Sequence, residues 1–401
     1  MKRTLNIAAA VLLAAAVLVS CDPGPAGLFA LLEQEEPLDK GTATFNANTA
    51  AFVTRLDTYY YAGVGSTLLR RLTTGGEWET VTDAGAPAGS IITAGVSDGT
   101  SFLYVSYSPS DALDESKRIR RTADGAAWSD YALSGIPVLD GPLADQSVQV
   151  QNLLLANGQL FAVAQYSTGT SSTDYETFFS IYSDGGAGNF SPVLEDLECG
   201  LPSSIAYDTA GSDYWIVAGN TVLTNASGSW AEDSANVTAA GFSSTNPVLG
   251  VFFDDTPGTD TIIAAATGTL WRLNTGGAYV ASGTFGSSTR RLSSVILVPA
   301  NGGLTDAVLV GVKSWASDSY TGYYEYDAAD NATFDATVVP NSTWTMVADD
   351  SNYVTTMDDL SIEGFYYDDT VGEETLFART VGGGLWSNTW NGTAWSGWDR
   401  E

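Results

Sequence analysis

The stretch Arg121-Thr122-Ala123-Asp124-Gly125-Ala126-Ala127-Trp128 is the clearest indication of the fold, because versions of it recur along the whole chain. In each version a β-prone run meets a turn of Gly, Asp or Asn, and an aromatic residue follows shortly after the turn. The aromatic residues of the seven copies are Trp78, Trp128, Phe190, Trp230, Tyr279, Phe334 and Trp395. Their separations of 40 to 62 residues are typical of four-stranded propeller blades joined by loops of variable length.

The pattern inside each repeat predicts an all-β fold, a seven-bladed β-propeller of four-stranded antiparallel blades with strands A to D. Strand B is the clearest, because a buried central strand is apolar on both faces. We expect these strands at Tyr59–Val64, Phe102–Tyr107, Leu160–Gln165, Tyr214–Ala218, Thr261–Ala266, Ala307–Val312 and Thr375–Ala378. Strand C precedes the turn and strand D carries the aromatic residue. The ring is expected to close by blade packing or by Thr42–Phe45 adding an edge strand.

The N-terminal residues predict export and a lipid anchor. Lys2 and Arg3 precede an apolar run that is too short to span a membrane, so residues 1–20 are a signal peptide. Leu18-Val19-Ser20-Cys21 resembles the bacterial lipobox, which implies cleavage before Cys21 and lipid on its thiol. The alternative is an ordinary secretory signal with an incidental cysteine. Residues 21–40 then form an acylated tether, and residues 41–401 form the propeller.

These features predict a location in the cell envelope, on the extracytoplasmic side of a membrane, in the periplasm or at the cell surface. The second cysteine, Cys199, has no partner if Cys21 is lipidated, and the chain has no histidine that could activate a catalytic thiol. The net charge of −31 excludes nucleic acid as a natural partner and is interpreted as a source of solubility. The sequence does not indicate an oligomeric state.

Acidic turns supply a second repeat. The run Gly250–Thr261 returns almost intact as Gly364–Thr375, and Ile205–Tyr214 is a shorter relative. We interpret these segments as A to B hairpin turns. Their paired aspartates could bind Ca²⁺, but the spacing matches no calcium loop, so a solvated acidic turn is favoured and no metal or cofactor is expected.

The stretch Thr122–Trp128 resembles a degenerate Asp box, the Ser/Thr-x-Asp-x-Gly-x-x-Trp turn of bacterial neuraminidase repeats. The resemblance implies a structural role, in which the Asp and the hydroxyl brace the C to D hairpin and the Trp packs between strands. This role transfers to Asp124 and Trp128, and more weakly to Asp184 and Phe190. One residue is missing between Asp and Gly, and four of the seven copies have no Asp at this position.

A sialidase-like activity would need three arginines that clamp a carboxylate, a tyrosine nucleophile and an acidic proton donor. The pairs Arg70-Arg71 and Arg120-Arg121 fall on predicted outer C strands, and only Arg290-Arg291 lies near an inner strand. Two functions therefore stay open, and the pattern favours the non-catalytic one. One is a membrane-anchored, non-catalytic module that binds or scaffolds a protein or glycan, and the other is a glycan-cleaving hydrolase on the same propeller.

Long connections between blades and between strands B and C predict the working face. The connection Pro340–Asp359 contains Trp344 and Tyr353, and a neighbouring loop adds Trp315 and Tyr320. If these four aromatic residues are exposed together, they offer apolar faces to sugar rings or to a partner's side chains, and they form the candidate ligand-binding site. The alternative is that they pack the loop onto the ring.

Overall fold

A computed structural model describes residues 45–401, except for a set of internal positions. These positions are 46, 48, 83, 87–88, 109–118, 132–148, 169–175, 186–189, 199, 210, 234–247, 254–260, 266–268, 274–278, 285–290, 299–306, 314–321, 328–344, 347–356, 358–359 and 371–373. The chain divides into two compact units, Met1–Ala43 and Thr44–Glu401. The predicted signal peptide, Cys21 and the tether lie outside the described residues, so these assignments stay predictions.

The strands of the second unit form seven four-stranded antiparallel sheets, each built from four strands that are consecutive in the chain. The first three blades contain β1 (Val53–Leu56), β2 (Tyr59–Val64), β3 (Thr67–Leu72) and β4 (Glu79–Thr80); β5 (Ile91–Ser97), β6 (Leu103–Ser108), β7 (Ile119–Thr122) and β8 (Trp128–Asp130); and β9 (Gln149–Ala156), β10 (Gln159–Thr168), β11 (Glu176–Ser183) and β12 (Ser191–Leu197).

The next two blades contain β13 (Pro202–Asp208), β14 (Asp213–Ala218), β15 (Thr221–Thr224) and β16 (Ala231–Glu232); and β17 (Val248–Phe253), β18 (Thr261–Ala265), β19 (Thr269–Leu273) and β20 (Tyr279–Thr284). The last two contain β21 (Arg291–Val298), β22 (Ala307–Lys313), β23 (Gly322–Asp327) and β24 (Thr345–Met346); and β25 (Ser361–Asp368), β26 (Thr375–Val381), β27 (Gly384–Thr389) and β28 (Asp399–Arg400).

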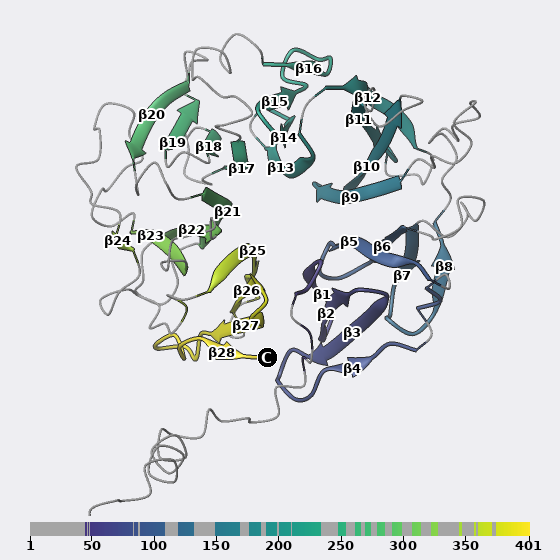
Figure 1. The fold of residues 1–401 in the computed structure, drawn as a ribbon, viewed down its shortest axis with the longest axis vertical. Coiled ribbons are helices and arrows are strands. Elements are labelled where there is room, and N and C mark those ends of the chain that lie inside the picture. The colour runs from purple at the N-terminus through teal and green to yellow at the C-terminus, as the bar shows by residue number, and fades with distance from the viewer. Residues whose placement is uncertain are drawn as a thin grey trace, which may run out of the picture. The chain divides into compact units, whose positions relative to one another are not determined.

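The first strands of the blades line the inside of a ring. Each of them neighbours the first strand of the next blade, and β25 neighbours β1, so the circle is complete (Figure 1). The predicted all-β propeller of four-stranded antiparallel blades is confirmed, and the sheets number seven as the turn count predicted. Among the described residues, no helix is long and apolar enough to cross a membrane.

The predicted B strands match β2, β6, β10, β14, β18, β22 and β26 with small shifts at their ends. The prediction that strand D carries the aromatic residue is correct for Trp128 and Tyr279, which begin β8 and β20. Elsewhere it is wrong in detail. Trp78, Phe190 and Trp230 come immediately before their strands, and in the last two blades β24 and β28 begin well after Phe334 and Trp395.

A β-bulge recurs in the inner strand of the blades. In six blades one residue of this strand has no partner in the ladder: Thr93, Gln151, Ser203, Leu249, Ser293 and Glu363. In the first blade, the Ala51 amide donates to the Gly63 carbonyl and the Gly63 amide donates to the Phe52 carbonyl, which gives the same two-to-one arrangement. A bulge bends a strand and increases its local twist, so the repeated bulge adds to the twist of each blade at its inner strand.

Side chains join neighbouring blades at the carbonyl that comes just before the bulge. Thr93 Oγ1 donates to the Val150 carbonyl at 2.8 Å, and Asn152 Nδ2 donates to the Pro202 carbonyl at 3.0 Å. Ser293 Oγ donates to the Ile362 carbonyl at 2.6 Å. The bulge frees a carbonyl from the ladder, and the next blade uses it as an acceptor.

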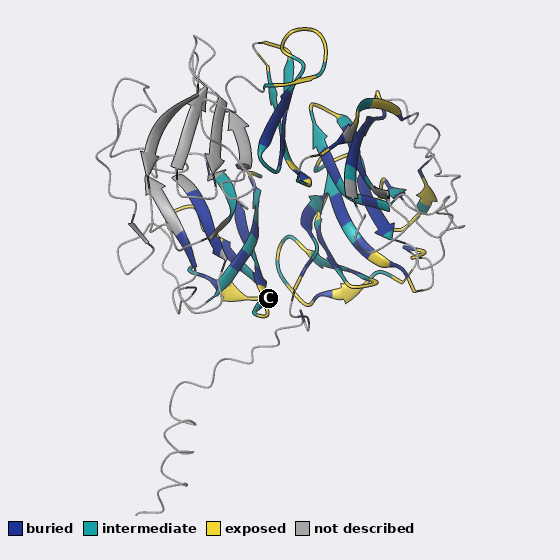
Figure 2. Ribbon diagram, turned by 45° about the horizontal axis from the view of Figure 1, so that its top comes forward, coloured by how far each residue is buried: buried dark blue, intermediate teal, exposed yellow. Residues whose placement is uncertain are grey.

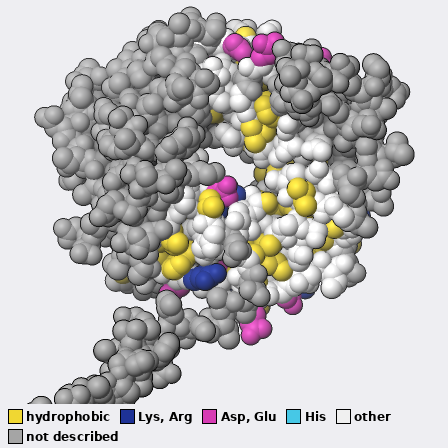
Figure 3. Space-filling model, in the orientation of Figure 1, with side chains coloured by type: hydrophobic (Ala, Val, Ile, Leu, Met, Phe, Trp, Pro, Cys, Tyr) yellow, Lys and Arg dark blue, Asp and Glu magenta, His cyan; other side chains and the backbone are white. Residues whose placement is uncertain are grey.

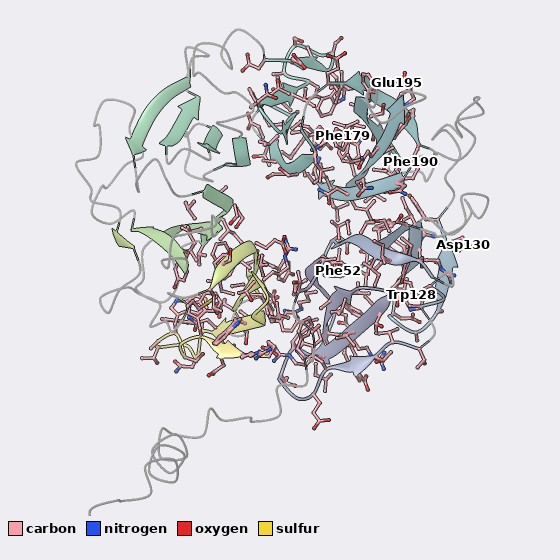
Figure 4. All side chains as sticks on the ribbon, viewed as in Figure 1. Phe52, Trp128, Asp130, Phe179, Phe190 and Glu195 are labelled. Carbon is pink, nitrogen blue, oxygen red and sulfur yellow. The ribbon has the colours of Figure 1, made fainter. Side chains whose placement is uncertain are left out.

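Buried apolar side chains from neighbouring blades pack against each other. Exposed residues concentrate at the turns and outer strands (Figure 2). Phe52 shows how tightly blades one and two pack (Figure 4). A Cβ atom at Gly95 would lie 2.3 Å from the Phe52 ring, and one at Gly63 would lie 2.7 Å from it. Both positions therefore require glycine because of close approach rather than because of backbone conformation.

Side chains of the first and last blades meet at a seam. Among the described residues the seventh sheet consists of β25 to β28, and blade packing joins it to the first blade. Residues 42–44 of the expected edge strand lie outside the described residues, so that alternative stays a prediction. Glu401 accepts hydrogen bonds from Arg71 Nη1 at 2.6 Å and from Trp78 Nε1 at 2.8 Å. Arg379 Nη1 donates to the Ala51 carbonyl at 2.6 Å. Buried ring contacts such as Tyr60 with Phe377, 4.8 Å apart, complete this seam.

Candidate functional site

A cavity of about 430 Å³ lies where the A to B turns of blades seven, one and two come together. These turns are close because β25, β1 and β5 are adjacent inner strands. It is lined by Arg55, Asp57, Ser97, Asp98, Gly99, Thr100, Tyr366, Asp368, Asp369 and Thr370. Figure 3 shows the described surface around the opening of the ring, where charged and apolar side chains lie next to each other. We call this cavity the turn pocket.

An ion pair forms one wall of the turn pocket. Arg55 Nη1 lies 2.9 Å from Asp368 Oδ2, and the two side chains are 15% and 4% exposed. Arg55 Nη1 also donates to Thr370 Oγ1, and Arg55 Nε donates to the Asp57 carbonyl at 2.6 Å. Because both charges are largely removed from water, their hydrogen bonds are needed to offset the cost of desolvation. The guanidinium is therefore fixed in place between blades one and seven.

Two tyrosines support this wall. The Tyr60 hydroxyl donates to Asp368 Oδ2 at 2.7 Å, and the Tyr366 hydroxyl accepts a hydrogen bond from the Arg55 amide at 3.0 Å. Burial, followed by the nearby Asp368 carboxylate, raises the pKa of Tyr366 well above its usual range. Burial also raises the pKa of Tyr60. Both phenols are therefore neutral at physiological pH, and neither can serve as a base or an anionic nucleophile there.

The opposite wall is made by the turns that follow β1 and β5. Asp98 Oδ1 accepts hydrogen bonds from the amides of Thr100, Ser101 and Phe102 at 3.0, 2.6 and 3.1 Å. Burial alone would raise the pKa of Asp98, but these amides outweigh it and lower the pKa. The Asp57 amide donates to the Gly99 carbonyl at 2.9 Å, which links the two turns.

The chemistry of the turn pocket is that of recognition through charge and hydrogen bonds. Its residues supply four carboxylates, four hydroxyls and one guanidinium, and the guanidinium is already bonded to Asp368. The lining includes no histidine, cysteine or lysine that could act as a nucleophile or base near neutral pH. Nor do the described residues contain a cluster of ligating side chains that could hold a metal ion.

The expectation of a solvated acidic turn is wrong for Asp368. This residue ends β25, is only 4% exposed and is paired with Arg55, whereas the adjacent Asp369 lines the turn pocket. The alternation of side chains at a strand end explains the difference, because successive residues face opposite ways. In the shorter relative, Asp208 lies near Asp213, and burial followed by this negative charge raises the pKa of Asp213. The turn after Gly250–Phe253 lies outside the described residues.

The sequence-predicted binding residues Trp315, Tyr320, Trp344 and Tyr353 all lie outside the described residues, as do Cys21 and Cys199. The structure therefore does not test them. Sequence reasoning missed the turn pocket because it searched the long loops of the other face. A usable signal existed, since an arginine in a first strand, Arg55, precedes an acidic turn in blade one.

The turn that resembles an Asp box has well-defined geometry. Thr122 Oγ1 accepts a hydrogen bond from the Gly125 amide at 2.8 Å, and Gly125 has a φ of 70°. Asp124 Oδ1 accepts from the amides of Ala126 and Ala127 at 2.9 and 2.8 Å. Trp128 is half-buried, and its Nε1 donates to the Gly125 carbonyl at 3.3 Å. Figure 4 places Trp128 and Asp130 on the outer strand of blade two. These contacts brace the C to D hairpin.

The other turns only partly share this geometry. Asn391 Oδ1 accepts from the amides of Thr393 and Ala394, both at 2.9 Å, so asparagine replaces aspartate in the same role. Asp184 behaves differently, because it is buried and accepts hydrogen bonds from the Tyr131 hydroxyl and the Leu160 amide. Phe190 is buried against Tyr131, with ring centroids 5.9 Å apart.

Comparison with solved structures shows the fold. The chain is similar to the extracellular domain of a putative one component system from B. thetaiotaomicron, with a TM-score of 0.51 and 16% identity. That match covers 85% of this chain but only 38% of the other protein. Raptor from Chaetomium thermophilum gives a TM-score of 0.48 at 12% identity, with coverage of 85% of this chain and 28% of that one. A luciferin-regenerating enzyme gives 0.43 at 10% identity, with coverage of 71% and 92%. No protein-family description matches the sequence, and no curated protein does so.

Proposed function

We propose that this chain is an exported lipoprotein whose propeller acts as a non-catalytic binding or scaffolding module for a protein or glycan ligand. The observation that carries this proposal is the turn pocket. It is a cavity held by bonded groups from three blades, and its lining supplies carboxylates and hydroxyls that can hold a ligand through charge and hydrogen bonds. Rigid blades that present a concave site are a common way for such scaffolds to bind ligands.

In this proposal the module works outside the cytoplasm. The apolar N-terminal run and Leu18-Val19-Ser20-Cys21 support export and attachment of lipid at Cys21. The similar protein from B. thetaiotaomicron is described as an extracellular domain, which suits the same side of a membrane. The candidate aromatic surface of Trp315, Tyr320, Trp344 and Tyr353 belongs to the long loops predicted on the other face and would provide a separate contact area for a protein or glycan.

The proposal is tested with full-length protein purified from membranes with detergent. Mass spectrometry should find an N-terminal peptide that begins at lipid-bearing Cys21, and a glycan array should show retained ligands. Trp315→Ala/Trp344→Ala should abolish retention and leave the melting temperature unchanged. Release of shortened glycans from the array would contradict a non-catalytic role. Retained ligand together with a large loss of stability in the variant would assign both tryptophans to packing.

A further inference from the structure

The turn pocket combines a concave shape with an excess of negative charge. We propose that it binds its ligand through a protonated primary amine, such as that of an amino sugar or a short diamine. This inference rests on the proposed binding role and assigns the chemical group that the pocket recognises. The cavity and its charge are separate observations. The volume indicates a compact organic ligand, and the charge of the lining indicates a cation.

The charge of the lining excludes anions. One arginine stands against four aspartates, which gives a net charge of −3. The arginine is bonded to Asp368, so the charges of Asp57, Asp98 and Asp369 remain to act on a ligand. Asp98 stays ionised because backbone amides lower its pKa. The negative charge of the lining would repel phosphate or carboxylate ligands, whereas it would attract a cation.

The polarity of the lining distinguishes an ammonium group from other cations. A primary ammonium has three N–H donors, and the pocket offers carboxylates together with the hydroxyl oxygens of Ser97, Thr100 and Thr370. The described residues provide no cluster that could hold a bare metal ion. The volume of about 430 Å³ fits a compact organic molecule.

The Asp98 carboxylate and the turns that carry the other acceptors are held in place before a ligand arrives. Three amides hold the Asp98 carboxylate, and the hydrogen bond from the Asp57 amide to Gly99 ties the turns of blades one and two together. The Arg55 and Asp368 pair fixes the side that blade seven provides. Little conformational entropy should therefore be lost on binding, which favours affinity for a small molecule.

Isothermal titration calorimetry in 150 mM NaCl tests this inference. The probes are glucosamine and 1,4-diaminobutane, with glucose and 1,4-butanediol as uncharged counterparts. The pocket variant is Asp57→Asn/Asp369→Asn, which keeps the Arg55 pair intact and places asparagine, which tolerates positive φ, at the φ of 53° found for Asp57. The control is Glu77→Gln/Glu232→Gln, which removes the same charge from two exposed positions outside the pocket.

We expect one saturable site for an amine probe, with affinity about tenfold weaker in the pocket variant and little changed in the control. The tighter of the two amines identifies the source of the amino group. Equal weakening in both variants would overturn the inference, because it would show only the general field of an acidic protein. Equal binding of glucose and glucosamine would also overturn the inference, because it would show that the amino group is not recognised. The proposed binding role would still stand in that case. Absence of binding by either amine would also overturn the inference, and a ligand retained on the glycan array would then show that the binding role stands without it.

Discussion

Asp368 shows how one carboxylate can serve two blades. It ends the inner strand of blade seven, yet it receives hydrogen bonds from Arg55 and Tyr60 of blade one. The sequence could indicate an acidic turn here, but not which of the two adjacent aspartates would be buried. That choice depends on the strand register and on a partner more than three hundred positions away in the chain. The burial of Asp368 is therefore a property of the closed ring.

This pair gives a prediction at the scale of the residue. Asp368→Asn should lower the free energy of unfolding by about 3 kcal/mol, because it leaves a largely buried guanidinium without its counter-charge. Urea denaturation followed by tryptophan fluorescence measures the change. Asp57→Asn is the matched control, since it removes an exposed carboxylate from the same pocket and should leave stability nearly unchanged. A stability equal to that of the wild type would show that the pair contributes nothing.

At the scale of the element, the C to D turn explains why the repeat was visible in the sequence. Asp124 and Asn391 each accept two backbone hydrogen bonds with one side-chain oxygen, so either residue can brace the turn. The B strands were predictable because both of their faces are buried. The short D strands were not, because a two-residue strand such as β24 or β28 has no periodicity of its own.

The turns give a second prediction. Asp124→Ala should lower the melting temperature at pH 7, whereas Asp124→Asn should preserve it because the amide oxygen can still accept both hydrogen bonds. Backbone hydrogen bonds from Ala127 and Ala126 hold the pKa of Asp124 below its usual value. The contribution of the carboxylate is then present above its unfolded pKa and is lost as pH falls through the folded one.

Thermal melts at pH 7 and at pH 3 measure this effect. The difference in melting temperature between wild type and Asp124→Ala should be smaller at pH 3 than at pH 7. Asn391→Ala should show a loss that does not depend on pH, because an amide does not titrate in this range, and it serves as the comparison. A gap for Asp124→Ala that is equally large at both values would contradict the assignment of the carboxylate.

At the scale of the whole molecule, the seam between blades seven and one determines whether the ring is closed. Among the described residues, side chains form this seam: Glu401 is bonded to Arg71 and Trp78, and Arg379 is bonded to the carbonyls of Ala50 and Ala51. The sequence left two ways of closing open, because strand exchange depends on pairing between distant segments that no local pattern records. The long loops and their aromatic residues lie outside the described residues, so the binding face predicted from them stays a prediction.

Buried tyrosines in several blades should make the fold of the whole ring sensitive to high pH. Burial raises the pKa of Tyr107 to about 12. Burial also raises the pKa of Tyr60, Tyr131 and Tyr366. A folded pKa above the unfolded value of about 10 means that the contribution to stability is complete below pH 10 and is lost as pH rises further.

The protein should therefore unfold cooperatively in alkali. Absorbance at 295 nm should show one set of tyrosines titrating near pH 10 and a second set titrating only together with the loss of β-sheet circular dichroism. Tyr107→Phe tests the cause, because its buried hydroxyl has no hydrogen-bond partner among the described residues. This variant should move the unfolding midpoint to higher pH without weakening the fold at pH 7. Titration of all tyrosines near pH 10 with the sheet intact would show that these phenols are accessible to water in the folded ring.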